Sequence, residues 1–111
     1  MEIAWEEKED ALCIRLSGRL DAESAPEVER RVRQALDEGK RRLLFDLSRL
    51  DYISSAGLRV ILLALKTLAP RGGRVVLCGP TPHVREVFEV SRFSTLLPIA
   101  ETAEAGWRLL Q

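Results

Sequence analysis

Short apolar runs alternate along this sequence with longer segments in which apolar residues recur every three or four positions. The run Leu43-Leu44-Phe45 is typical of a strand buried on both faces, whereas residues 56–69 carry Leu and Ile at helical spacing. Strands that alternate with helices favour a largely parallel sheet, because each helix returns the chain to the start of the next strand. The sequence therefore predicts an α/β fold.

The predicted elements follow the order β-β-α-β-α-β-α-β-α. Strands 2–8 and 11–17 alternate apolar and polar residues around a polar turn, which indicates an opening β-hairpin. The first helix has Ser24 as its cap, Glu27 at the capping-box position and a stop at Gly39. The remaining predicted elements are strands 41–47, 74–78 and 96–99 and helices 56–69, 81–90 and 102–110. We expect a mixed, mostly parallel sheet in a single domain spanning residues 1–111.

Composition argues against several classes of function. The 111-residue chain has 17 Lys and Arg and 17 Asp and Glu, so no net charge favours nucleic acid or an anionic membrane as partner. The start is too acidic for a signal peptide and no apolar run spans a bilayer, so we expect no membrane insertion and a cytoplasmic protein. A single small domain with balanced charge is expected to be a monomer when free. With one histidine, and with Cys13 and Cys78 in apolar strands, we expect buried reduced thiols, no metal site and no cofactor.

Three loops follow the predicted strands at one edge of the sheet, at 18–23, 48–55 and 79–81. The carboxyl ends of parallel strands lie at the same edge, where partners and ligands usually dock in open α/β sheets. We therefore expect Asp21, Asp46 and Ser55 to be neighbours at or near this edge.

Two serines, Ser54 and Ser55, stand where the strand 41–47 and its loop lead into the helix 56–69. The N–H groups at a helix amino end lack partners and carry a partial positive charge. A serine there either caps the helix or, once phosphorylated, places its phosphate against these N–H groups. The residues alone leave both interpretations open.

No enzyme mechanism is indicated by the residues. Ser55 lacks the preceding glycine of a nucleophile elbow, and the only histidine, His83, begins a different helix as a surface residue. We therefore expect no catalytic residue. Binding of a nucleotide or small molecule through Asp21 and Asp46 is an alternative, although no glycine-rich phosphate loop accompanies them.

The segment 45–62, with Ser54-Ser55-Ala56-Gly57-Leu58 at its centre, resembles the signature of the STAS domain, the fold of bacterial anti-sigma factor antagonists. Gly18-Arg19-Leu20-Asp21 resembles the G-x-L-D loop of that family, and residues 73–79 and 84–88 resemble its later strand and helix. The resemblance covers nearly the whole chain and implies a single STAS-like domain.

Antagonists of this family bind an anti-sigma factor that is also a serine kinase, and so release a sigma factor. The kinase then phosphorylates a serine of the D-S-S-G-L motif, which breaks the complex, and a phosphatase reverses the modification. The resemblance implies that Ser55 is the phosphoacceptor and that the partner-binding residues are Asp21, Ser54, Ser55, Ala56, Gly57 and Leu58.

Two positions depart from the motif, because Ser54 replaces its usual Asp and Ala56 replaces its second Ser. The missing acid leaves less negative charge beside the acceptor. A STAS domain that is never phosphorylated is the alternative, such as the small subunit that supports the ATPase of a bacterial lipid-transport ABC complex.

Overall fold

A computed structural model describes all residues from 1 to 111 and has the predicted order of elements. The strands are β1 (Glu2–Lys8), β2 (Ala11–Leu20), β3 (Arg42–Ile53), β4 (Arg74–Cys78) and β5 (Ile99–Ala100). The α-helices are α1 (Ala25–Asp37), α2 (Ser55–Leu68), α3 (Pro82–Val90) and α4 (Ala103–Leu110), with two short 3-10 helices, η1 (Ala69–Arg71) and η2 (Phe93–Thr95).

The strands lie in the sheet in the same order as in the sequence, from β1 at one edge to β5 at the other. β1 and β2 form an antiparallel hairpin, whereas β2, β3, β4 and β5 are parallel to one another. Each parallel connection passes through a helix, as a parallel crossover requires. The prediction of a mixed, mostly parallel sheet with an opening hairpin is therefore confirmed.

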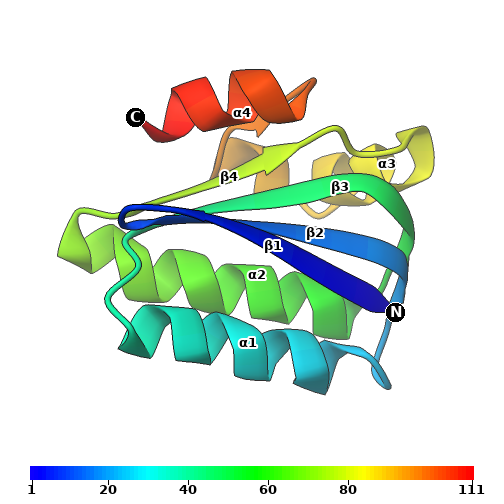
Figure 1. Cartoon of the computed structure of the whole chain (residues 1–111). Coiled ribbons are helices and arrows are strands. Elements are labelled where there is room, and N and C mark those ends of the chain that lie inside the picture. The colour runs from blue at the N-terminus through cyan, green and yellow to red at the C-terminus, as the bar shows by residue number, and fades with distance from the viewer.

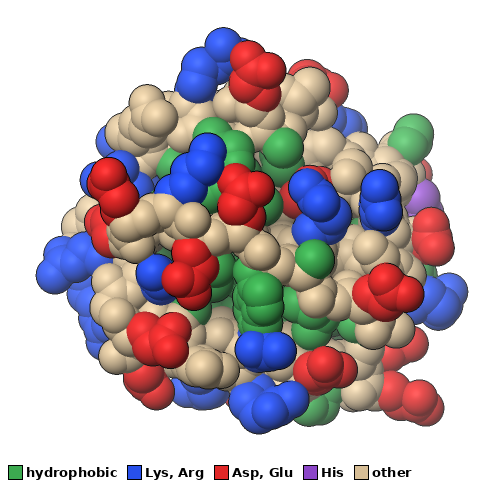
Figure 2. Space-filling view, viewed as in Figure 1, with side chains coloured by type: hydrophobic (Ala, Val, Ile, Leu, Met, Phe, Trp, Pro, Cys, Tyr) green, Lys and Arg blue, Asp and Glu red, His purple; other side chains and the backbone are tan.

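Helices cover both faces of the sheet, with α1 and α2 on one side and α4 on the other in Figure 1. α1, α2 and α3 pack over a core of 23 buried residues that includes Leu16, Phe45 and Phe88. α4 packs on the opposite face over 7 buried residues that include Leu44 and Cys78. None of these helices has the length and hydropathy that crossing a bilayer requires. Lys, Arg, Asp and Glu side chains are interspersed over the face in Figure 2, in keeping with the balanced charge.

Two strands extend further than the sequence indicated. β2 continues to Leu20 and β3 to Ile53, through segments that were predicted to be loops. The parallel pairing continues across a register shift, with Gly18 opposite Leu50 and Leu20 opposite Ile53. Polar residues interrupt the apolar pattern there, so the partner strand rather than the local sequence keeps these segments extended. The prediction of loops starting at residues 18 and 48 was therefore wrong.

The last strand is shorter than predicted. It comprises Ile99–Ala100 instead of residues 96–99. The Leu77 N–H still donates to the Pro98 carbonyl at 3.0 Å, but Pro98 has no N–H of its own to continue the ladder. The chain at Leu96 and Leu97 forms the turn after η2 instead.

Candidate functional site

The carboxyl end of β3 leads into α2 through a single residue, Ser54. The Ser54 N–H donates to the Leu20 carbonyl at 2.9 Å, which fixes the end of β3 against the end of β2. The Ser54 backbone is extended, with φ −97° and ψ 175°, and its Oγ accepts a long hydrogen bond from the Gly57 N–H at 3.4 Å. Ser54 is therefore the N-cap of α2.

Ser55 is the first residue of α2, and its side chain is exposed. The N–H groups of Ser55 and its neighbour Ala56 donate to no protein acceptor. Since Ser54 already caps the helix, the Ser55 hydroxyl is not needed to hold the helix end. The structure thus separates the two roles that the sequence left open: Ser54 serves as the cap, and Ser55 offers a free hydroxyl at the positive end of the helix.

Gly57 is buried beneath the motif, where no side chain fits. A Cβ added at this position would lie 2.7 Å from Leu20 Cγ and 2.8 Å from Ile53 Cγ1. The glycine therefore lets the first turn of α2 approach the ends of β2 and β3. Ala56 and Leu58 are half-buried and pack against the larger core, so the motif exposes Ser55 more fully than its neighbours.

Asp21 organises the loop between β2 and α1. Its Oδ1 accepts hydrogen bonds from the Glu23 N–H at 3.0 Å and from the Ser24 N–H at 3.1 Å. Hydrogen bonding from the Ser24 N–H, helped by Glu23, by the Ser24 hydroxyl and by the charge of Arg19, lowers the pKa of the Asp21 carboxyl below its ordinary value. Because the adjoining residue Leu20 binds Ser54, this ionised side chain lies on the loop that borders the motif.

Ser24 occupies the N-cap position of α1, as predicted, but its side chain does not cap the helix. Its backbone is already helical, with φ −92° and ψ −22°, and its side chain forms no capping hydrogen bond. The Ser24 hydroxyl instead donates to the Arg19 carbonyl at 2.7 Å and accepts from the Asp21 N–H at 3.0 Å. The Ser24 hydroxyl is therefore engaged in the turn around Asp21 and is not available to cap α1.

Asp46 lies on the other face of the sheet, so the prediction that it neighbours Ser55 was wrong. Phe45 and Leu47 point into the larger core, and the side chain between them must point the other way. Burial alone would raise the pKa of Asp46. Hydrogen bonds from the Ser48 N–H and hydroxyl, at 3.0 and 2.7 Å, and an ion pair with Arg15 at 3.0 Å outweigh burial and lower that pKa. Asp46 therefore has a structural role.

A model of the STAS domain family matches residues 2–106 of this sequence. This chain belongs to the STAS domain family. A relative from Bordetella bronchiseptica, BtrV, provisionally named an anti-sigma factor antagonist, is 44% identical over 96% of this chain and 91% of its own. The anti-sigma F factor antagonist of Paenibacillus polymyxa is 28% identical over 89% of this chain and 86% of its own.

Solved structures share the fold of this STAS domain. The anti-sigma factor antagonist SpoIIAA in its unphosphorylated form matches with a TM-score of 0.84 at 25% identity, over 94% of this chain and 91% of SpoIIAA. A provisionally assigned anti-sigma factor antagonist from Thermotoga maritima matches with a TM-score of 0.92 at 22% identity, over 97% of this chain and 93% of its own.

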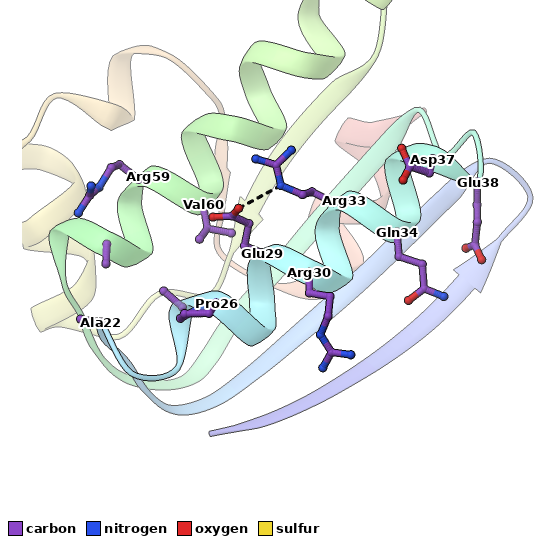
Figure 3. Close-up of a pocket in the computed structure, with 12 residues that line it drawn as sticks. Ala22, Pro26, Glu29, Arg30, Arg33, Gln34, Asp37, Glu38, Arg59 and Val60 are labelled. Carbon is purple, nitrogen blue, oxygen red and sulfur yellow. Dashed lines mark hydrogen bonds and ion pairs between the residues drawn. The ribbon is translucent and has the colours of Figure 1, made fainter.

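A surface groove of about 970 Å³ runs between α1 and α2 of this STAS domain and begins beside the motif (Figure 3). Ala22 and Ala56 line its end near Ser55, and the charged residues Glu29, Arg33 and Arg59 line its walls. The sequence reasoning did not single out Arg59, although its position four residues after Ser55 is a signal that helix periodicity could have supplied.

Three side chains also stack at the edge of the sheet where Ser55 lies, and the sequence did not predict this stack. The Arg19 guanidinium lies 4.2 Å from the centre of the Tyr52 ring, and Tyr52 stacks on His83 with ring centres 6.3 Å apart. His83 is exposed in the first turn of α3, as predicted. The three residues come from β2, β3 and α3, so only the assembled sheet brings them together.

Proposed function

We propose that this STAS domain is an anti-sigma factor antagonist, which binds a kinase-type anti-sigma factor, releases a sigma factor and is switched off by phosphorylation of Ser55. The main support is the exposed Ser55 hydroxyl at the first position of α2, with capping left to Ser54. The similarity to BtrV over nearly the full length of both chains supports the same function.

The proposed partner surface comprises the motif and the loop that borders it. Ser55 is its exposed centre, and Ser54, Ala56 and Leu58 are partly exposed around it. Gly57 contributes from below, by letting α2 approach the sheet closely enough to present Ser55. Asp21 adds an ionised carboxylate at the border, suited to a cationic side chain of the partner.

The exposed hydroxyl at the start of α2 supports the proposal that Ser55 is phosphorylated. The kinase transfers the γ-phosphoryl group of ATP to Ser55 Oγ, and ADP and the hydroxyl proton are released. The new group carries about −1.5 to −2 charges at neutral pH. Free N–H groups and the helix dipole at the start of α2 accommodate this charge, so the fold persists.

A partner packed against Ser55 does not accommodate the phosphate, because the phosphate loses water on binding and meets apolar groups or other anions. The modification therefore releases the partner without unfolding the antagonist. A cognate phosphatase restores the hydroxyl, and the free protein is a cytoplasmic monomer without a cofactor. The domain regulates by binding and has no enzymatic activity of its own.

The test is affinity capture from native lysate with four baits: wild type, Ser55→Asp, Ser55→Ala and Ser54→Ala. We expect wild type and Ser55→Ala to retain an ATP-binding serine kinase and Ser55→Asp to lose it. The purified kinase should label wild type and Ser54→Ala with radioactive phosphate, but not Ser55→Ala. Equal capture of a transporter ATPase by wild type and Ser55→Asp would contradict the switch and favour the non-switching alternative, which the names of the relatives do not support.

A further inference from the structure

The first turns of α2 carry an arginine whose charge is unmatched. Arg59 is exposed and forms none of the ion pairs in the structure. Glu29 lines the same groove, but its carboxylate binds Arg33 at 3.0 Å instead. Figure 3 shows the Arg59 side chain pointing away from that pair. Its guanidinium donors are therefore free.

Arg59 follows Ser55 by four residues in the same helix. Side chains at this spacing are neighbours on a helix surface, with Cβ atoms about 5–6 Å apart. Long helical side chains also lean toward the amino end of their helix, which brings the Arg59 guanidinium toward Ser55. A phosphate on Ser55 Oγ would thus meet a guanidinium, which binds phosphate oxygens through two parallel hydrogen bonds.

The surrounding charges favour an anion at this point. The residue before Ser55 is the neutral Ser54, where the family motif has an aspartate, and the N–H groups of Ser55 and Ala56 are free. Asp21, on the bordering loop, opposes an anion. Arg19 lies 3.9 Å from the Asp21 carboxylate and offsets part of its charge, whereas Arg59 is the unpaired cation on the helix face of Ser55.

We propose that Arg59 is a positioning residue that binds the phosphate of phosphorylated Ser55 within the same chain. The ion pair holds the phosphate against the first turn of α2 and moves the second pKa of the phosphate further below neutral pH. This inference rests on the proposed function only in taking Ser55 as the modified residue.

The experiment incorporates phosphoserine at position 55 during translation, by stop-codon suppression, so that no kinase is required. The second pKa of the phosphate is measured by ³¹P NMR titration of the whole chain. We expect Arg59→Gln to raise this pKa by about 0.2–0.4, the size of effect typical of an ion pair across one helical turn. Arg59→Lys should restore part of the shift, because a lysine keeps the charge but not the paired donors.

Lys66→Gln is the matched control, because it removes one positive charge from the same helix about 16 Å along its axis from Ser55. We expect this variant to titrate like wild type, and circular dichroism to show that all variants are folded. An unchanged phosphate pKa in Arg59→Gln, or an equal rise in Lys66→Gln, would overturn the assignment of Arg59. Failure of the proposed function would be seen in the kinase assay, as absence of radioactive phosphate on Ser55. That outcome does not affect the NMR titration, because the phosphoserine is incorporated during translation.

Discussion

Replacement of Gly57 by alanine tests whether the motif glycine is needed for packing. The added Cβ would lie 2.7 and 2.9 Å from Cγ and Cδ2 of Leu20 and 2.8 Å from Cγ1 of Ile53. Ordinary carbon contacts begin at about 3.5 Å, so these neighbours would have to move by about 0.8 Å. Leu20 is 0% exposed and Ile53 is 3% exposed, so neither side chain can make room by moving into solvent.

The expected cost follows from two opposing terms. Overpacking of a tight core costs about 1–3 kcal/mol, whereas alanine gains up to about 1 kcal/mol over glycine within a helix. We therefore expect Gly57→Ala to lower the free energy of unfolding by about 1–2 kcal/mol, and the melting temperature by about 4–8 °C. Urea unfolding followed by circular dichroism measures the first quantity, and a thermal scan measures the second.

A double-mutant cycle with Leu20→Ala separates packing from other effects of the glycine. Leu20→Ala removes two of the three close contacts, at its own cost of about 2–5 kcal/mol. In that background only the Ile53 contact remains, so Gly57→Ala should cost about 1 kcal/mol less than in wild type, and this difference is the coupling energy. Gly39→Ala is the control, because Gly39 has φ +87° and no atom within 4 Å of an added Cβ, so its cost should be the same in both backgrounds. Equal costs of Gly57→Ala in the two backgrounds would refute the packing argument.

Three further predictions concern the cap, the buried carboxylate and the thiols. Ser54→Ala should destabilise the protein by about 0.5–1 kcal/mol in urea unfolding, whereas Ser55→Ala should stay within about 0.5 kcal/mol of wild type, because only Ser54 caps α2. The pKa of Asp46 is lower in the folded state, so its contribution to stability is complete above about pH 4 and is lost as pH falls through the folded value. Asp46→Asn should therefore be less stable by about 1–3 kcal/mol at neutral pH and lose less stability on acidification. Burial raises the pKa of Cys13 to about 11 and that of Cys78 to about 12, so a disulfide reagent such as DTNB should titrate both thiols only after unfolding.

The motif shows why two adjacent serines have different roles. Ser54 continues the extended backbone of β3, and its Oγ turns back onto the Gly57 N–H. Ser55 already has helical geometry, so its side chain projects from the helix into solvent. One residue of difference in position therefore decides which hydroxyl caps the helix and which is exposed to solvent.

Local sequence patterns determined the element order and the class of sheet. Apolar runs such as Leu43-Leu44-Phe45 and the helical spacing of α2 report whether a segment is buried on two faces or on one, and this information is local. Ser54 and Ser55 were identified in the same way, because serine is one of the residues preferred at the start of a helix. Resemblance to the STAS motif then added the prediction that Ser55 is the phosphoacceptor, which periodicity could not supply.

Only the tertiary structure decided which side chains meet. The ends of β2 and β3 are extended because they pair with each other across a register shift, and Asp46 is separated from Ser55 because alternate residues of a strand face opposite sides of a sheet. The crowding around Gly57 likewise depends on Leu20, which is 37 positions earlier in the chain. Contacts between residues far apart in sequence do not change the local hydrophobic pattern around either residue. The pattern in a single sequence therefore predicts the helices and strands, but not which of their side chains meet at the site.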